Sequence, residues 1–483
     1  MAHDLPVAEF RRAAERLTNW IAAYLERPER YPVVAPVRPG DVAAALPLHP
    51  PAQAESLDAI IDDFESVILP GVTHWNHPGF FAYFAISASA PGILAEYLTA
   101  ALDINAMLWK TGPSATELEQ RALDWLRQML GLEAGWFGVI NDTASIGTLL
   151  ALAAAREAKP ELEIRARGMA GRSDLPRLRI YASEHAHSSV DKSVMALGFG
   201  HENLVSIRGN DQFEMRSEEL RRAIADDRAQ GMLPLAVVAT VGTTGTTSID
   251  PVPEIAAICS RESLWLHVDA SYAGVAAIVP ERRDILRGVD HADSVVVNPH
   301  KWLFTPVDIS ALYTRRPDVL KRAFALVPEY LTTAEQDQAI NLMDYGVQLG
   351  RRFRALKLWM VIRAFGVEGL AERLRGHMAL AREFATWIED DAAWELMAPV
   401  PFSLVCFRYA PPGVDEAELN RMNQAILDRV NASGRVFLSH TKLNGRFTLR
   451  LAIGNLRTER EHVTVAWQLL REATVSQGVT VHR

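Results

Sequence analysis

A regular alternation of short apolar runs and helical segments between residues 136 and 299 constrains the fold most. Runs such as LAVVATV (235–241) and SVVV (294–297) consist almost entirely of branched apolar residues. A strand is apolar along its whole length when helices bury both of its faces, as in a parallel sheet. The sequence therefore predicts a doubly wound α/β domain. The predicted strands are residues 136–140, 178–183, 203–207, 235–241, 265–270 and 294–299.

The segments on either side of this region have different patterns. Residues 7–25 and 56–69 carry apolar residues at helical spacing and are joined by a Pro-rich connector. Two such helices cannot bury much surface alone, so we expect an arm that packs on something else, such as a second subunit. Residues 403–409 and 445–454 resemble strands with a helix between them. We expect an N-terminal helical arm at 1–88, a large α/β domain at 89–357 and a small α+β domain at 358–483.

Composition excludes several classes of protein. With 483 residues, 49% of them hydrophobic, the chain can form more than one domain. A net charge of −9 argues against a nucleic-acid partner. The two cysteines, Cys259 and Cys406, suit a reducing compartment. No run reaches the roughly 18 apolar residues of a membrane span, and histidine pairs such as His74 and His77 are too few ligands for a metal site. We expect a soluble, cytoplasmic protein without a metal ion.

Polar residues end two of the predicted strands, and they suggest chemistry. Asp269 ends WLHVD, and Lys301 lies in NPHKW directly after a run of valines. Parallel strands carry such residues to one crevice at their carboxyl ends. The two could form a buried ion pair. A desolvated lysine also suits Schiff-base chemistry, and pyridoxal phosphate requires a lysine together with a carboxylate that keeps its pyridine nitrogen protonated.

Further strand-end residues could serve the same cofactor. Ala144 and Ser145 begin a helix whose free N–H groups could hold a phosphate, although DTAS could equally be an ordinary N-cap. His187 could stack on the pyridine ring, or it could be a loop histidine that faces solvent. Thr243 lies in TVGTTGTTSID, where a hydrogen-bonded turn is as good an interpretation as a cofactor contact.

Six blocks of sequence, in this order, resemble the pyridoxal-phosphate-dependent aromatic L-amino-acid decarboxylases: THWNHPGFFAYF, LWKTGPSATELE, AHSSVDK, HVDASYAG, NPHKW and LGRRFRALKLW. The resemblance covers essentially the whole chain. It implies the aspartate-aminotransferase-like fold (fold type I) and a homodimer in which the N-terminal arms embrace the partner subunit.

The resemblance also implies roles for individual residues. Lys301 forms the Schiff base with the cofactor, Asp269 binds the pyridine nitrogen, and His187 stacks over the ring. Tyr330 lies on a mobile loop and supplies the proton to Cα; related aldehyde synthases have phenylalanine there. Ser271 stands where the family often has alanine. The implied contacts of the cofactor are Ala144, Ser145, His187, Thr243, Asp269, Ser271, Asn298, His300 and Lys301.

For the substrate, the resemblance implies an aromatic amino acid. Ile86 replaces a threonine that reaches the ring hydroxyl in relatives that bind catechols, which weakens the case for dopa. The implied substrate contacts are Trp75, Tyr83, Phe84, Ile86, Gly350 and, from the other subunit, Met107. The expected reaction is decarboxylation of tryptophan, phenylalanine or, less favoured, tyrosine or dopa. The alternatives are an aromatic aldehyde synthase and a non-catalytic protein that binds pyridoxal phosphate.

Overall fold

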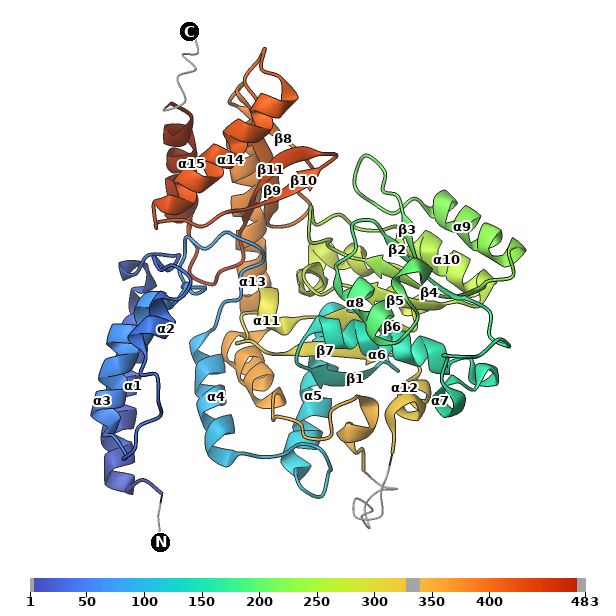
Figure 1. Cartoon of the computed structure of the whole chain (residues 1–483), viewed down its shortest axis with the longest axis horizontal. Helices are drawn as coiled ribbons and strands as arrows, with labels where there is room; N and C mark the ends of the chain where they lie inside the picture. The colour runs from blue at the N-terminus through green and yellow to red at the C-terminus, as the bar shows by residue number, and fades with distance from the viewer. Residues whose placement is uncertain (1–3, 327–338, 476–483) are drawn as a thin grey trace.

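The computed structural model describes residues 4–326 and 339–475, and its largest unit is a seven-stranded sheet (Figure 1). The strand order is β1-β7-β6-β5-β4-β2-β3. The strands are β1 (Phe137–Asn141), β2 (Leu178–Ser183), β3 (Leu204–Ile207), β4 (Leu233–Thr240), β5 (Trp265–Asp269), β6 (Ser294–Val297) and β7 (Ser310–Thr314). Strands β2 to β6 pair in parallel, whereas β7 is antiparallel to both β1 and β6. The largely parallel sheet is confirmed, but β7 was not predicted.

Both faces of this sheet are covered by helices. In β6, Val295 and Val297 belong to the apolar core on one face, and Val296 belongs to the core on the other. The valine run is therefore continuous because successive side chains enter different cores. The helices are α5 (Pro113–Leu130), α9 (Ser217–Ala229) and α10 (Val252–Glu262) on the first face, and α6 (Ala144–Glu157), α8 (Ser189–Ala196) and α12 (Pro317–Phe324) on the second.

A second, antiparallel sheet lies near the C-terminus, in the order β10-β11-β9-β8. Its elements are α13 (Ala355–Glu389), β8 (Trp394–Leu396), β9 (Leu404–Tyr409), α14 (Glu416–Ala432), β10 (Ser439–Leu443), β11 (Arg446–Ala452) and α15 (Arg460–Val475). Strands β9 and β11 match the two predicted segments; β8 and β10 were not predicted. Helix α13 is broken at Gly366, whose φ of 65° favours glycine, and it runs from the large sheet to the small one (Figure 1).

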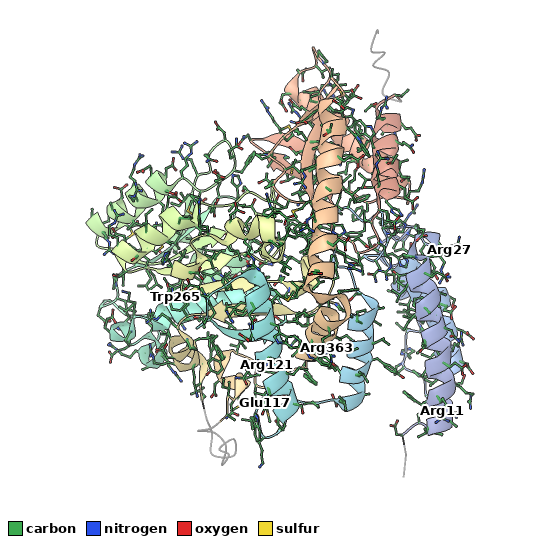
Figure 2. The ribbon with its side chains drawn as sticks, turned by 180° about the vertical axis from the view of Figure 1, so that it is seen from behind. Arg11, Arg27, Glu117, Arg121, Trp265 and Arg363 are labelled. Atoms are coloured by element: carbon green, nitrogen blue, oxygen red, sulfur yellow. The ribbon has the colours of Figure 1, made fainter. Side chains whose placement is uncertain are left out.

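The N-terminal helices stand apart from the large sheet (Figure 1). They are α1 (Val7–Glu26), α2 (Asp41–Ala45), α3 (Leu57–Asp63) and α4 (Ala90–Leu102). Arg16 of α1 forms ion pairs with Asp58 and Asp62 of α3. The back view shows Arg11 and Arg27 near the two ends of α1 (Figure 2). Ala13 is the one buried residue of α1, so this helix has no core of its own.

The division into an arm, a large domain and a small domain stays a prediction, as does the cytoplasmic location. Across residues 4–326 and 339–475, no helix is long and apolar enough to cross a membrane. The same described residues hold no group of three or more potential metal ligands. Tyr330 lies outside the described residues.

Candidate active site

A cavity of about 170 Å³ lies at the carboxyl ends of the strands in the large sheet. Asp269 is the last residue of β5, and Lys301 lies in the one-turn helix α11 (Pro299–Trp302), directly after β6. Strands β5 and β6 are neighbours and parallel, so they carry both side chains to one crevice, as the spacing predicted. All the predicted cofactor contacts except Thr243 line this cavity.

Lys301 is half-buried in this cavity. Desolvation lowers the pKa of its ammonium group from the ordinary value, and the nearby Asp269 opposes that shift. Its Nζ lies 5.6 Å from the centre of the Phe84 ring. Because burial favours the neutral amine, Lys301 is suited to react with a carbonyl group.

A stack of aromatic rings packs against α11 and supports it. The ring of Trp302 stacks on Tyr272, with centroids 4.9 Å apart, and Tyr272 stacks on Phe84 at 3.7 Å. Trp302 Nε1 donates to Nδ1 of His377, in α13, at 3.0 Å. The tryptophan of NPHKW therefore fixes the turn that carries Lys301. Tyr272, which also lines the cavity, was not predicted as a site residue.

The Asp269 carboxylate is nearly buried, with 6% of the residue exposed. Its Oδ1 accepts two hydrogen bonds, from the backbone N–H of Ser271 at 3.0 Å and from the hydroxyl of the same residue. Ser271 thus lines the cavity while its hydroxyl is directed to Asp269. Whether this serine contacts the cofactor was left open by the sequence.

His187 enters the cavity from the loop after β2. Its Nδ1 accepts a hydrogen bond from the backbone N–H of Ser189 at 3.1 Å, so the neutral ring carries its proton on Nε2. Burial lowers the pKa of His187, and the charge of Lys301 lowers it further. The ring is therefore neutral at neutral pH, as suits a group that packs against a heterocycle.

The cavity also has polar groups suited to a phosphate. Ala144 begins α6, and the side chain of the N-cap residue Thr143 does not bond to the first-turn N–H groups, which leaves them available for an anion. Two further polar atoms at the cavity are buried without a hydrogen-bond partner among the described residues: the hydroxyl Oγ1 of Thr240, which can donate to a ligand, and the amide Oδ1 of Asn298, which can accept from one. Buried polar atoms normally have partners. These atoms, with Lys301 and Asp269 beside them, fit pyridoxal phosphate.

His300 lies on the same side of the cavity. Its Nδ1 accepts a hydrogen bond from the backbone N–H of Ile309 at 3.0 Å, which places the proton of the neutral ring on Nε2. Burial, with a contribution from Lys301, lowers the pKa of His300 to about 4. The residue is thus an uncharged hydrogen-bond donor.

Thr243 is placed differently from the prediction. Its side chain is fully buried, and its Oγ1 bonds to the hydroxyl of Ser248 at 2.9 Å within the loop after β4. Thr240, Gly242 and Thr244 line the cavity in its place. Gly242 has a φ of 90°, and a Cβ on it would lie 2.5 Å from Cβ of Ala273. The loop therefore forms the hydrogen-bonded turn that was the alternative interpretation of Thr243.

The predicted substrate contacts are not gathered in one place. Of the six, Phe84 alone lines the cavity. Trp75 and Tyr83 stack on each other, with ring centroids 6.1 Å apart, and 53% of Tyr83 is exposed. Met107 and Gly350 both lie near Nδ2 of Asn105, which is 3.6 Å from Sδ of Met107 and would be 3.7 Å from a Cβ on Gly350. Ile86 is half-buried. One copy of the chain thus assembles the cofactor contacts but not the substrate contacts.

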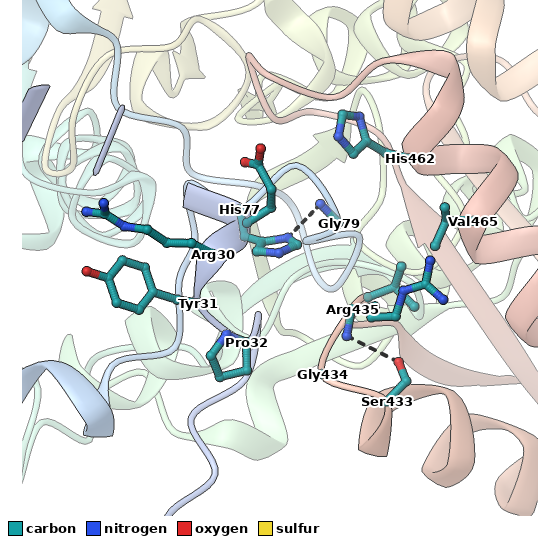
Figure 3. Close-up of a pocket in the computed structure, with 12 residues that line it drawn as sticks. Arg30, Tyr31, Pro32, His77, Gly79, Ser433, Gly434, Arg435, His462 and Val465 are labelled. Atoms are coloured by element: carbon teal, nitrogen blue, oxygen red, sulfur yellow. Dashed lines mark hydrogen bonds between the residues drawn. The ribbon is translucent and has the colours of Figure 1, made fainter. Parts of the chain in front are cut away.

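A larger hollow, of about 450 Å³, lies between the connector after α1 and the small sheet's helices (Figure 3). It is lined by residues 29–32, His77, Gly79, the turn after α14 and His462. His77 Nδ1 accepts from Gly79 N at 2.9 Å, and burial lowers the pKa of His77 to about 4. Its lining residues include no lysine, so this hollow offers no Schiff-base chemistry.

Comparison with known proteins gives the same assignment. The pyridoxal-dependent decarboxylase conserved domain matches residues 39–410. Tryptophan decarboxylase 2 of Oryza sativa subsp. japonica is 40% identical over 98% of this chain and 96% of its own length. The chain belongs to the pyridoxal-dependent decarboxylase family. It is therefore a carboxy-lyase that uses pyridoxal phosphate, and the family, fold type and cofactor predicted from the sequence are confirmed.

Two further relatives bear on the reaction. The crystal structure of Oryza sativa TDC with pyridoxal phosphate and tryptamine superposes with a TM-score of 0.95, at 36% identity, over 99% of this chain and 100% of that chain. Phenylacetaldehyde synthase of Arabidopsis thaliana is 38% identical over 96% of this chain and 95% of its own length. Close relatives of this decarboxylase thus include both amine-forming and aldehyde-forming enzymes.

Proposed function

We propose that this decarboxylase acts on aromatic L-amino acids and releases an arylalkylamine and carbon dioxide. The observation that carries the proposal is the cavity in which Lys301 and Asp269 lie against the stacked rings of Phe84 and Tyr272. A flat aromatic wall beside the reactive lysine suits an aromatic side chain. Relatives named for tryptophan and for tryptamine, similar over nearly the whole chain, support the same substrate class.

In this proposal each residue of the cavity has a distinct task. Lys301 binds the cofactor covalently, Asp269 keeps its pyridine nitrogen protonated, and the neutral His187 packs on its ring. Bound pyridoxal phosphate supplies an electron sink for the bond that breaks. The residues that hold the phosphate end are Ala144, Ser145, Asn298 and His300. Because Asp269 is nearly buried and Lys301 is half-buried, their electrostatic effects are stronger than they would be in bulk solvent.

We infer that the enzyme is a homodimer and that Met107 belongs to the partner subunit's substrate site. Met107 does not line the cavity of its own chain. Helices α1 and α4 expose large apolar side chains: Val7, Phe10, Leu17, Leu94, Tyr97, Leu98 and Leu102. Apolar faces of this kind are typical of surfaces that pair with another chain.

The aldehyde synthases among the relatives make oxidative deamination the second candidate. Tyr330 favours simple decarboxylation, because we propose that its hydroxyl delivers a proton to Cα after carbon dioxide has left. Removal of that hydroxyl in Tyr330→Phe should slow protonation and let oxygen intercept the carbanion. The ratio of amine to peroxide formed under air should therefore fall. An unchanged ratio with amine formed at the wild-type rate would mean that another group donates this proton.

A substrate panel tests the proposed function. The purified holoenzyme is given tryptophan, phenylalanine, tyrosine, dopa and glutamate, and amine, carbon dioxide and hydrogen peroxide are measured for each. We expect equal amounts of amine and carbon dioxide from one or more aromatic substrates, no peroxide, and no reaction with glutamate. Equal amounts of peroxide and carbon dioxide would identify an aldehyde synthase. Carbon dioxide from glutamate alone would contradict the aromatic assignment.

A further inference from the structure

Ser271 has an unusual arrangement for a residue that lines the cavity. It is nearly buried, with 6% exposed, yet its hydroxyl is already engaged with Oδ1 of Asp269. Its backbone N–H donates to the same oxygen at 3.0 Å. Its backbone carbonyl accepts from the N–H of Asn298 at 3.0 Å. One residue therefore links the carboxylate that ends β5 to the turn that precedes Lys301.

The two oxygens of Asp269 are consequently not equivalent. Oδ1 receives both hydrogen bonds, whereas no described residue donates a hydrogen bond to Oδ2. Hydrogen bonds to one oxygen stabilise the ionised form of a carboxylate and reduce its basicity. Oδ2 is therefore left as the acceptor for a ligand in the cavity.

Other titratable groups near Asp269 do not take over this task. Lys301 and His187 face it across the cavity, and the His187 ring is neutral at neutral pH. His267, two residues earlier on β5, is fully buried. Its Nδ1 lies 2.9 Å from the hydroxyl of Ser294, and burial lowers its pKa to about 4, so it carries no charge. Ser271 is thus the neutral donor that acts directly on the carboxylate.

We propose that Ser271 is a positioning residue that acts through Asp269: it holds the carboxylate and makes Oδ2 a weaker base for the proton on the cofactor's pyridine nitrogen. This inference rests on the proposed role of Asp269. Without the hydroxyl, more negative charge remains on Oδ2, which favours the protonated nitrogen. Loss of the Ser271 hydroxyl therefore raises the pH at which that nitrogen loses its proton.

The test uses the full-length enzyme loaded with pyridoxal phosphate that carries ¹⁵N in its ring. The ¹⁵N NMR signal is followed against pH in the wild type and in Ser271→Ala, which keeps the backbone N–H bond and removes only the hydroxyl. We expect the transition in Ser271→Ala to lie higher by about one pH unit, the scale of one hydrogen bond to a charged group. Ser271→Thr should match the wild type, and Ser271→Cys, a weaker donor, should lie between them.

Two outcomes separate this inference from the assignment of Asp269. If Ser271→Ala coincides with the wild type, or moves toward lower pH, the inference about Ser271 is wrong. Asp269→Ala is measured in parallel and should bring the signal to its unprotonated limit. A signal in Asp269→Ala that equals the wild type would instead overturn the role of Asp269 itself.

Discussion

The two halves of the active site are built in different ways. The predicted cofactor contacts other than Thr243 come together in one chain: the ends of β2, β4, β5 and β6 and the start of α6 bring them into one cavity. The predicted substrate contacts are dispersed. Trp75 and Tyr83 form one aromatic pair, with Tyr83 half exposed. Met107 and Gly350 form another group around Asn105.

The two sets of contacts differ because they lie on different kinds of structural element. A sheet buried on both faces fixes the positions of its strand ends, so the cofactor half is preorganised within one chain. The contacts of the substrate half lie on connecting segments beside exposed apolar helices. We infer that the fold of one chain creates the chemistry, and that pairing of two chains creates the substrate site. The following experiments test this division.

The largest effect is expected from Lys301→Ala. Lys301 is the lysine that lines the cavity, so its removal should abolish the covalent link to the cofactor. We expect turnover to fall by about a thousandfold or more. The loss should be accompanied by loss of visible absorbance from the bound cofactor. Lys442→Ala, at an exposed position of β10, is the matched control and should behave like the wild type. Wild-type turnover in Lys301→Ala would remove this residue from the mechanism.

Asp269→Ala should have the next largest effect. It removes the carboxylate that we propose keeps the pyridine nitrogen protonated, which should cost about 3 kcal/mol of transition-state stabilisation, roughly a hundredfold in kcat/KM. Cofactor content is measured alongside, because binding through Lys301 and the phosphate contacts should persist. Asp318→Ala, an exposed carboxylate on α12, serves as the control. An undiminished kcat would show that Asp269 does not support the reaction.

The free energy of unfolding should depend on pH through His377, the residue that accepts a hydrogen bond from Trp302. Burial lowers the pKa of His377 to about 4, whereas an unfolded histidine titrates near 6.5. Between these values the unfolded chain binds a proton that the folded chain does not, so stability is lost as pH falls from 6.5 toward 4. His377→Gln retains an acceptor for Trp302. It should reduce the loss of unfolding free energy between pH 7 and pH 5 by about 2 kcal/mol.

Urea unfolding at the two pH values, at equal protein concentration, measures this difference. His49→Gln changes an exposed histidine and should leave the loss unaltered. Equal losses in His377→Gln and the wild type would mean that His377 is not held neutral in the folded protein.

The sequence predicted which strand-end residues share the cavity because the signals for strand ends are local. A strand with two buried faces must be continuously apolar, so the ends of β5 and β6, and with them Asp269 and Lys301, could be located from the pattern of apolar residues. β7 was not predicted because its segment SALYT is short, begins with a buried serine and comes after the region in which strands and helices alternate. β8 and β10 are three and five residues long, and β10 alternates exposed and buried residues.

Side-chain direction in turns could not be predicted in the same way. Thr243 and Thr244 are adjacent in sequence, and the left-handed conformation of Gly242 is part of the turn in which Thr244 lines the cavity and Thr243 does not. The bond from Ser271 to Asp269 likewise depends on the geometry of the chain after β5. The placement of Met107 in the site of a second chain rests on resemblance, because no pattern within one sequence states which surfaces of two copies meet.

A hybrid enzyme tests the central claim, that one chain supplies the cofactor half and its partner completes the substrate half. Chains with Lys301→Ala and chains with Met107→Arg, each inactive as a homodimer, are given different affinity tags, and the heterodimer is purified through both. If Met107 serves the partner's site, the heterodimer has one site with both lesions and one with none. We predict about half of the wild-type activity per dimer. A heterodimer as inactive as the two parent enzymes would show that each chain builds its site alone and would contradict the account.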